Sequence, residues 1–166
     1  EPDIVVLAKG LASGFPLSGI AARSELMQQS PAGSQGGTYG GNAVSWAAAV
    51  ATLRVMKEEK LLENSAEMGA ALLARLRPFQ DRYPGIGEVR GLGLMVGIEF
   101  TTPEGEPDTK TAKAVMKACL DDGLMLLTCG TYGNTVRWIP PLIINESHLD
   151  EAFAIFAAAL EKVIPR

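Results

Sequence analysis

Three features of this chain have the chemistry to act on a small molecule, and the first is Lys9. It follows the apolar residues 4–8 and precedes Gly10. A short apolar run rich in β-branched residues predicts a strand buried on both faces, and Gly10 would let the chain turn directly after the lysine. Burial disfavours the charged form of an amine and makes it available as a nucleophile. The alternative is a lysine that ends a strand and extends its amine into water.

The second feature is a loop rich in glycine and polar residues at positions 30–42, which leads into a helical pattern from residue 43. Such a loop presents backbone N–H groups at the positive end of the helix dipole, where an anion such as phosphate is favoured. Thr38 would add a hydroxyl donor to this group. The alternative is a solvent-exposed loop without a ligand.

The third feature is Arg137, which lies between Val136 and Trp138 in a predicted strand. Its apolar neighbours predict a buried guanidinium, and a buried guanidinium must be paired. The planar fork of arginine matches a carboxylate in two-point contact. That carboxylate belongs either to a substrate or to one of the aspartates and glutamates of the chain.

Composition argues against several other classes of function. The net charge is −4 and the basic residues are scattered, so no basic patch for nucleic acid is expected. No apolar run approaches the roughly 20 residues that span a membrane. Two isolated cysteines and one histidine give no metal-ligand spacing and no disulfide framework. We therefore expect a cytoplasmic protein without a metal site.

The elements that must position these residues follow from hydrophobic periodicity. Residues 43–57 predict a well-packed helix with Trp46, Val50 and Leu53 at helical spacing, and a second helix runs from residue 61 until Pro78 kinks or ends it. After Gly85 the pattern predicts an α+β layer, a small sheet with helices on one face. Its expected elements are strands 86–90 and 94–100, a helix capped by Thr109, strands 124–127 and 135–139, and a helix capped by Ser147.

Five motifs, taken together and in this order, resemble the class III pyridoxal-phosphate-dependent aminotransferases over essentially the whole chain. They are residues 7–10 (LAKG), 14–17 (GFPL), 36–42 (GGTYGGN), 91–94 (GLGL) and the pair 136–137 before 140–142 (VR, then PPL). The loop at 127–134 most resembles the 4-aminobutyrate aminotransferase branch. The resemblance implies an α/β fold, in which residues 1–55 end the large cofactor domain of a fold-type I aminotransferase and residues 56–166 form an α+β small domain.

The resemblance also implies roles for the three features. Lys9 matches the lysine that binds the aldehyde of pyridoxal 5'-phosphate as an imine and later moves a proton between substrate and cofactor. Thr38 matches the residue that reaches the phosphate of the partner subunit's cofactor in a homodimer. Arg137 matches the arginine that binds a substrate carboxylate.

The reaction implied is transfer of an amino group from an ω-amino acid, foremost 4-aminobutyrate, to the 2-oxo acid 2-oxoglutarate. Acetylornithine and other ω-amino-acid aminotransferases remain open. The chain begins with Glu1 rather than methionine, so we expect a fragment. The family's groups for the pyridine ring and most of the phosphate lie upstream of the lysine, which predicts that the isolated chain is a non-catalytic module.

Overall fold

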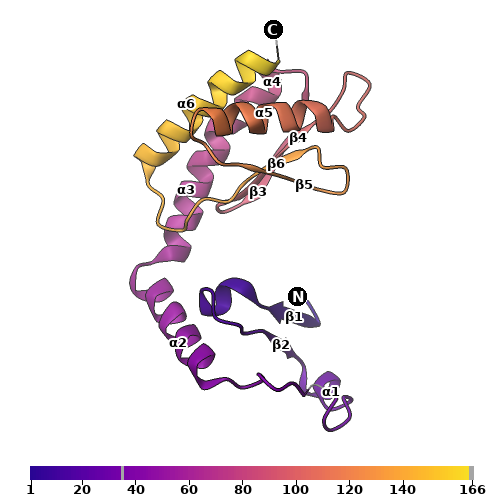
Figure 1. Cartoon of the computed structure of the whole chain (residues 1–166), viewed down its shortest axis with the longest axis vertical. Helices are drawn as coiled ribbons and strands as arrows, with labels where there is room; N and C mark the ends of the chain where they lie inside the picture. Colours follow the sequence, from indigo (N-terminus) through magenta and orange to yellow (C-terminus); the bar gives the residue numbers. More distant parts are fainter. Residues whose placement is uncertain (35, 165–166) are drawn as a thin grey trace. The chain divides into compact units, whose positions relative to one another are not determined.

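The computed structural model describes residues 1–34 and 36–164, and the chain divides into two compact units, Glu1–Lys60 and Leu61–Arg166 (Figure 1). The division falls close to the domain boundary predicted after residue 55. Helix α2, Ala43–Glu58, runs across that residue, so the assignment of residues 1–55 and 56–166 to two domains stays a prediction.

The first unit is built on a hairpin. Strand β1, Ile4–Leu7, pairs antiparallel with β2, Gly19–Ala22. The loop between them contains the short 3-10 helix η1, Lys9–Ala12, and β2 is followed by α1, Ser24–Met27, and then α2. An ion pair of 2.7 Å joins Arg23 to Asp3 across the open end of the hairpin, one residue beyond the last backbone pair of each strand.

The predicted burial of this unit is wrong, although the strand expected in residues 4–8 and the helix expected at residues 43–57 both form. Strand β1 is exposed at every position, with Val5 39% and Val6 71% exposed on its two faces. The reason is that β2 is its only strand neighbour in the described part of the chain. Helix α2 likewise exposes Trp46, Val50 and Leu53, and its buried residues are the small Ser45 and Ala49.

The second unit is a four-stranded antiparallel sheet with order β3-β4-β6-β5 and helices packed on one face (Figure 1). Its elements are α3 Leu61–Leu76, α4 Pro78–Arg82, β3 Ile86–Leu92, β4 Met95–Phe100, α5 Thr109–Asp121, β5 Leu127–Cys129, β6 Thr135–Trp138 and α6 Glu146–Val163. The α+β layer is therefore confirmed. Pro78 separates α3 from α4, as the pattern predicted.

The core of the second unit lies between the sheet and these helices. Alternate strand residues point into it, as expected for a sheet covered on one side. Fully or almost fully buried are Val96, Ile98, Phe100, Val136 and Trp138 from the strands and Leu72, Leu76, Val115, Phe156 and Leu160 from the helices. The opposite face of the sheet carries the residues between them, among them the exposed Arg137 and the buried Thr135.

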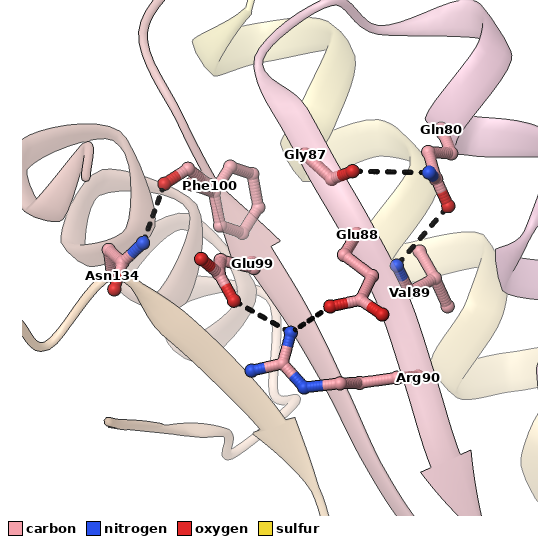
Figure 2. Close-up of polar contacts among 8 residues, drawn as sticks. All are labelled: Gln80, Gly87, Glu88, Val89, Arg90, Glu99, Phe100 and Asn134. Atoms are coloured by element: carbon pink, nitrogen blue, oxygen red, sulfur yellow. Dashed lines mark hydrogen bonds and ion pairs between the residues drawn. The ribbon is translucent and has the colours of Figure 1, made fainter. Parts of the chain in front are cut away.

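One edge of this sheet is fixed by a side chain from α4. Strand β3 changes register between Ile86 and Glu88, where its pairing with β4 is irregular. Gln80 donates to the Gly87 carbonyl at 3.1 Å and accepts from the Val89 N–H at 3.2 Å (Figure 2). The side-chain amide therefore satisfies backbone groups that the irregular ladder leaves unpaired.

Two helix caps differ from the predicted ones. Helix α5 is capped by Asp108 rather than Thr109, because the Asp108 carboxylate accepts from the Thr111 N–H at 2.9 Å. Helix α6 is capped by Asn145 rather than Ser147, and Asn145 Oδ1 accepts from the His148 N–H at 3.1 Å. Strand β5 begins at Leu127, so the strand predicted at residues 124–127 is displaced toward the carboxyl end.

Candidate active site

Lys9 takes an unusual backbone conformation at the start of η1. Its φ is 52°, in the left-handed region, whereas Gly10 is absent from the residues with positive φ. The turn expected of Gly10 is therefore made by the lysine itself. A left-handed conformation costs a non-glycine residue about 1–2 kcal/mol, and such strain is concentrated at functional sites.

The amine of Lys9 is not buried in the described chain, which corrects the burial expected of it. Lys9 is exposed, and no hydrogen bond or ion pair of its side chain occurs among the described residues. The physical reason is the same as for β1, because only the hairpin partner flanks this strand. What remains is a primary amine free of partners at the end of a strand.

The turn that carries Lys9 packs against α2. Helix η1 packs against α2, and Ala12 at its end is fully buried. The Thr52 hydroxyl of α2 lies 3.2 Å from Ser13 Oγ, directly after η1. The backbone of the lysine is therefore fixed by the first unit's own packing, while its side chain is free.

Thr38 lies in the glycine-rich loop, of which Gln35 is outside the described residues. A backbone hydrogen bond from Gly40 N to Gly37 O closes a turn around Thr38 and Tyr39. Thr38 is exposed, and its hydroxyl has no partner in the described part of the chain. It is available as a donor to an anion.

The start of α2 offers less to an anion than the sequence suggested. Asn42 Oδ1 accepts from Val44 N at 3.0 Å and from Ser45 N at 3.1 Å. Because this cap occupies two of the first N–H groups of the helix, the donors left for a phosphate are Thr38 and the N–H groups of the loop.

Arg137 points away from the core, so the expectation of a buried, paired guanidinium is wrong. Its neighbours Val136 and Trp138 are both buried on the helix-covered side of β6, whereas Arg137 is exposed. Alternation along a strand places it on the opposite face. No hydrogen bond or ion pair reaches its guanidinium from any described residue. The structural ion pair that stood as the alternative is absent from this part of the protein.

An apolar pocket of about 680 Å³ adjoins this arginine. Residues of β5 and β6, the segment 139–144 and the first turns of α6 form its wall, with Leu127, Ile139, Pro140 and Ile143 beside Arg137. A mostly apolar cavity with one unpaired cation suits a small molecule that has an aliphatic part and a carboxylate.

Arg90 is a second arginine on the same face of the sheet, and sequence reasoning missed it. Its Nη1 atom lies 2.6 Å from Glu88 Oε2 and 2.6 Å from Glu99 Oε2 (Figure 2). The only available signal was the alternation of charged residues in two separate strands. Their pairing becomes visible once the register of β3 against β4 is known.

Other kinds of site find no support in the described residues. Those residues contain no group of three or more His, Cys, Asp or Glu arranged to hold a metal ion. None of their helices has the length and apolarity needed to cross a membrane.

Comparison with known proteins decides the family. The model of the family described as Aminotransferase class-III matches residues 1–160. The chain belongs to the class III aminotransferases. The 5-aminovalerate aminotransferase DavT of Pseudomonas putida is 40% identical over 163 residues, which are 98% of this chain and 38% of that protein. The 4-aminobutyrate aminotransferase GabT of Escherichia coli is 36% identical over 163 residues, 97% of this chain and 38% of that protein.

Solved structures agree with this class III assignment. A transaminase from a directed-evolution study by ancestral reconstruction superposes with a TM-score of 0.87 at 33% identity, covering 98% of this chain and 38% of that one. The predicted fold class, part of an α/β aminotransferase, is confirmed. This class III chain spans 38% of the length of each of these relatives.

Class III aminotransferases depend on pyridoxal phosphate. The residues of the first unit fit that cofactor. Among the described residues, neither the Lys9 amine nor the Thr38 hydroxyl has a partner. The amine is of the kind that an aldehyde requires, and the hydroxyl suits a phosphate oxygen. Both lie within residues 1–60, whereas Arg137 belongs to the second unit.

Proposed function

We propose that this chain forms the carboxyl-terminal part of an aminotransferase that moves an amino group from an ω-amino acid, foremost 4-aminobutyrate, to 2-oxoglutarate. The observation that carries the reaction class is the class III match over residues 1–160. The relatives named for 5-aminovalerate and 4-aminobutyrate support the substrate class. Both of those donors have an amine and a carboxylate at opposite ends of an aliphatic chain.

Lys9 is the residue that holds the cofactor and transfers the proton. Bound pyridoxal phosphate supplies an electron sink for the substrate carbon. Lys9 Nζ would hold the aldehyde group of the cofactor, and as a free amine it would carry the proton that leaves the substrate carbon. The left-handed backbone at Lys9 supports this role, because strained backbone is concentrated at functional sites and here the turn packs against α2.

Arg137 binds the substrate carboxylate, and the pocket beside it receives the aliphatic chain. The unpaired, exposed guanidinium and the apolar wall of the pocket support this assignment. Thr38 donates to the phosphate of the partner subunit's cofactor in a homodimer. The free hydroxyl in the loop around Gly37 and Gly40 supports it.

Other ω-amino-acid aminotransferases, including those for acetylornithine, fit the same residues, because a single arginine does not measure the length of the amine donor. We assign no residue of this chain to the pyridine nitrogen or to stacking on the ring. Cofactor binding and tuning then fall mostly to other residues, and we expect the 166-residue chain alone to be a poor catalyst.

Covalent labelling of Lys9 tests the proposal directly. The intact enzyme is incubated with pyridoxal phosphate, reduced with borohydride and digested, and the peptides are weighed by mass spectrometry. We expect the pyridoxyl mass on the peptide with Lys9. Lys60 is a matched control, because its φ of 53° is also left-handed and it lies outside the proposed site.

The variant Lys9→Ala should lose the label, and its turnover should fall by roughly 10³-fold or more, because both the covalent anchor and the proton carrier are removed. Label on Lys60, or unchanged turnover in Lys9→Ala, would contradict the assignment. The same labelling and a turnover assay are applied to the 166-residue chain, which we expect to be a poor catalyst by itself. Substrate turnover by this chain alone would contradict that expectation.

A further inference from the structure

The outer face of the sheet carries an arginine on each side of a glycine. Arg90 of β3 is paired with Gly97 of β4, and Gly97 is paired with Arg137 of β6. Residues paired directly across antiparallel strands point to the same face. The two arginines therefore stand two strand spacings apart, about 10 Å. Gly97 puts no side chain of its own between them, and the Thr135 methyl group lies 3.1 Å from the position that a Cβ at Gly97 would take.

Glu99 stands within reach of both arginines. It follows Gly97 by two residues on the same strand, so it lies on the same face and diagonally from each arginine. Diagonal neighbours in an antiparallel sheet are about 7–8 Å apart at Cα, which long side chains can bridge. In the structure the Glu99 carboxylate contacts Arg90 at 2.6 Å, and no described residue makes a hydrogen bond or ion pair with the guanidinium of Arg137.

The position of Glu88 accounts for the ion pair between Glu99 and Arg90. Glu88 is paired directly opposite Glu99, and two like charges in such positions repel each other. Arg90 Nη1 lies 2.6 Å from each carboxylate and joins them (Figure 2). The three side chains are between 32% and 57% exposed, so their contribution to stability is small. Their effect is on the direction in which Glu99 points.

We propose that Arg90 is a positioning residue for substrate binding: it holds the Glu99 carboxylate on its own side of Gly97 and so leaves Arg137 free for the carboxylate of the substrate. This inference rests on the proposed role of Arg137. Without Arg90, the freed Glu99 becomes an internal competitor, because a carboxylate tethered one strand away occupies the guanidinium that the substrate requires.

The expected effect is on substrate affinity rather than on the chemical step. An exposed ion pair of this kind is favoured by a factor of up to about five. The variant Arg90→Met keeps the aliphatic stem and removes the charge, and we expect KM for carboxylate substrates to rise about two- to fivefold with kcat unchanged. The double variant Arg90→Met/Glu99→Gln should return KM to the wild-type value.

The first experiment examines the 166-residue chain itself, by NMR of the arginine side-chain N–H groups. The Arg137 signal is assigned by its loss in Arg137→Lys. We expect this signal to shift in Arg90→Met and to return in Arg90→Met/Glu99→Gln. An Arg137 signal that is the same in all three chains would overturn the proposal, because Glu99 would then not turn toward Arg137.

The second experiment measures KM and kcat of the intact enzyme with the same variants. Arg75→Met is the matched control, since Arg75 also contacts two carboxylates, those of Glu146 and Asp150, on a different face of the unit. Loss of an ion-paired arginine there should leave KM for carboxylate substrates unchanged. Arg90→Lys should stay near the wild-type KM because it keeps a cation for Glu99.

The outcomes separate this inference from the function on which it rests. If Arg137→Ala raises KM and Arg90→Met does not, the positioning role of Arg90 is refuted and the carboxylate site stands. If Arg137→Ala leaves KM unchanged, the carboxylate site itself is refuted. General damage to the sheet would raise KM in both Arg90→Met and the double variant, so rescue by Glu99→Gln distinguishes competition from misfolding.

Discussion

Arg137 illustrates how a flanking pattern misleads at the scale of one residue. Its large apolar neighbours predicted burial, yet those neighbours are buried because they alternate with it, and alternation is what carries the arginine to the outer face. The sequence pointed to Arg137 as a candidate, which stays a prediction, but it did not reveal that the guanidinium has no ion pair among the described residues. That freedom depends on where the acidic side chains of β3 and β4 fall after the strands pair.

Replacing Arg137 tests its role at this scale. In the intact enzyme, Arg137→Ala should raise KM for carboxylate substrates roughly 10- to 100-fold, because a hydrogen-bonded charge contact of about 1.5–3 kcal/mol is lost. Steady-state kinetics with the amino donor and the 2-oxo acid measure it. Arg82→Ala, which removes an arginine paired with Glu161 elsewhere, is the control. A KM equal to that of the control would leave Arg137 without a substrate role.

For Lys9, the sequence pointed to the residue but did not predict its backbone conformation. Position and chemical type pointed to it from the sequence, but the left-handed backbone was expected to need Gly10. Propensity favours glycine at such a position, and nothing in the local sequence tells that the lysine takes it. The strain becomes visible only with the packing of η1 against α2.

At the scale of elements, the helices and strands follow closely from periodicity, while their caps do not. Asp108 and Thr109 are adjacent, and both residue types cap helices well. The structure selects Asp108, whose carboxylate accepts from both the N–H and the hydroxyl of Thr111. The same ambiguity between Asn145 and Ser147 displaced the predicted start of α6.

The cap at Asp108 makes the stability of the second unit depend on pH. Hydrogen bonds from Thr111 hold the pKa of the Asp108 carboxyl below its ordinary value. A lowered folded-state pKa means that the cap stabilises the fold above the unfolded-state pKa, near pH 4, and that this contribution is lost as the pH falls through the folded-state value. Asp108→Ala should lower the free energy of unfolding by about 1 kcal/mol at pH 7.

Urea denaturation at pH 7 and at about pH 3 measures this effect. The difference between the wild-type chain and Asp108→Ala should shrink at the lower pH. Asp108→Asn keeps an acceptor for the Thr111 N–H but cannot titrate, so its difference from wild type should vary with pH in the same direction. A difference that is constant across the two pH values would show that the cap does not depend on ionisation.

At the scale of the whole molecule, nearly all large buried side chains belong to the second unit. The order of elements and the α+β layer were predictable because each pattern is local. The exposure of β1 and of the apolar side chains of α2 was not, because burial depends on neighbours that a strand or helix pattern does not specify. The class III match over residues 1–160 spans both units.

The two units can be followed separately by natural probes. Trp46 in the first unit is 56% exposed and Trp138 in the second is 3% exposed. Burial also raises the pKa of the Cys119 thiol to about 11, so this thiol is protected and almost wholly protonated at neutral pH. In a chain with Trp46→Phe and Cys129→Ser, thiol labelling of Cys119 should begin in the same range of urea concentration as the red shift of Trp138.

Coincidence of the two signals would identify the second unit as one cooperative body. Labelling of Cys119 well below the urea concentration of the fluorescence transition would instead reveal local opening of α5. The chain that retains Cys129 is the control, because Cys129 is only partly buried and should react before any unfolding.

The glycine at position 97 limits which side chains the outer face of the sheet can carry between Arg90 and Arg137. A Cβ added there would lie 3.1 Å from the Thr135 methyl group, so any side chain requires Thr135 to yield. A smaller residue at 135 would give a designer room to place a polar or bulky group between the two guanidinium groups. Substitutions at positions 97 and 135 are therefore coupled, because a side chain at 97 requires either a shift of Thr135 by a few tenths of an ångström or a smaller residue at 135.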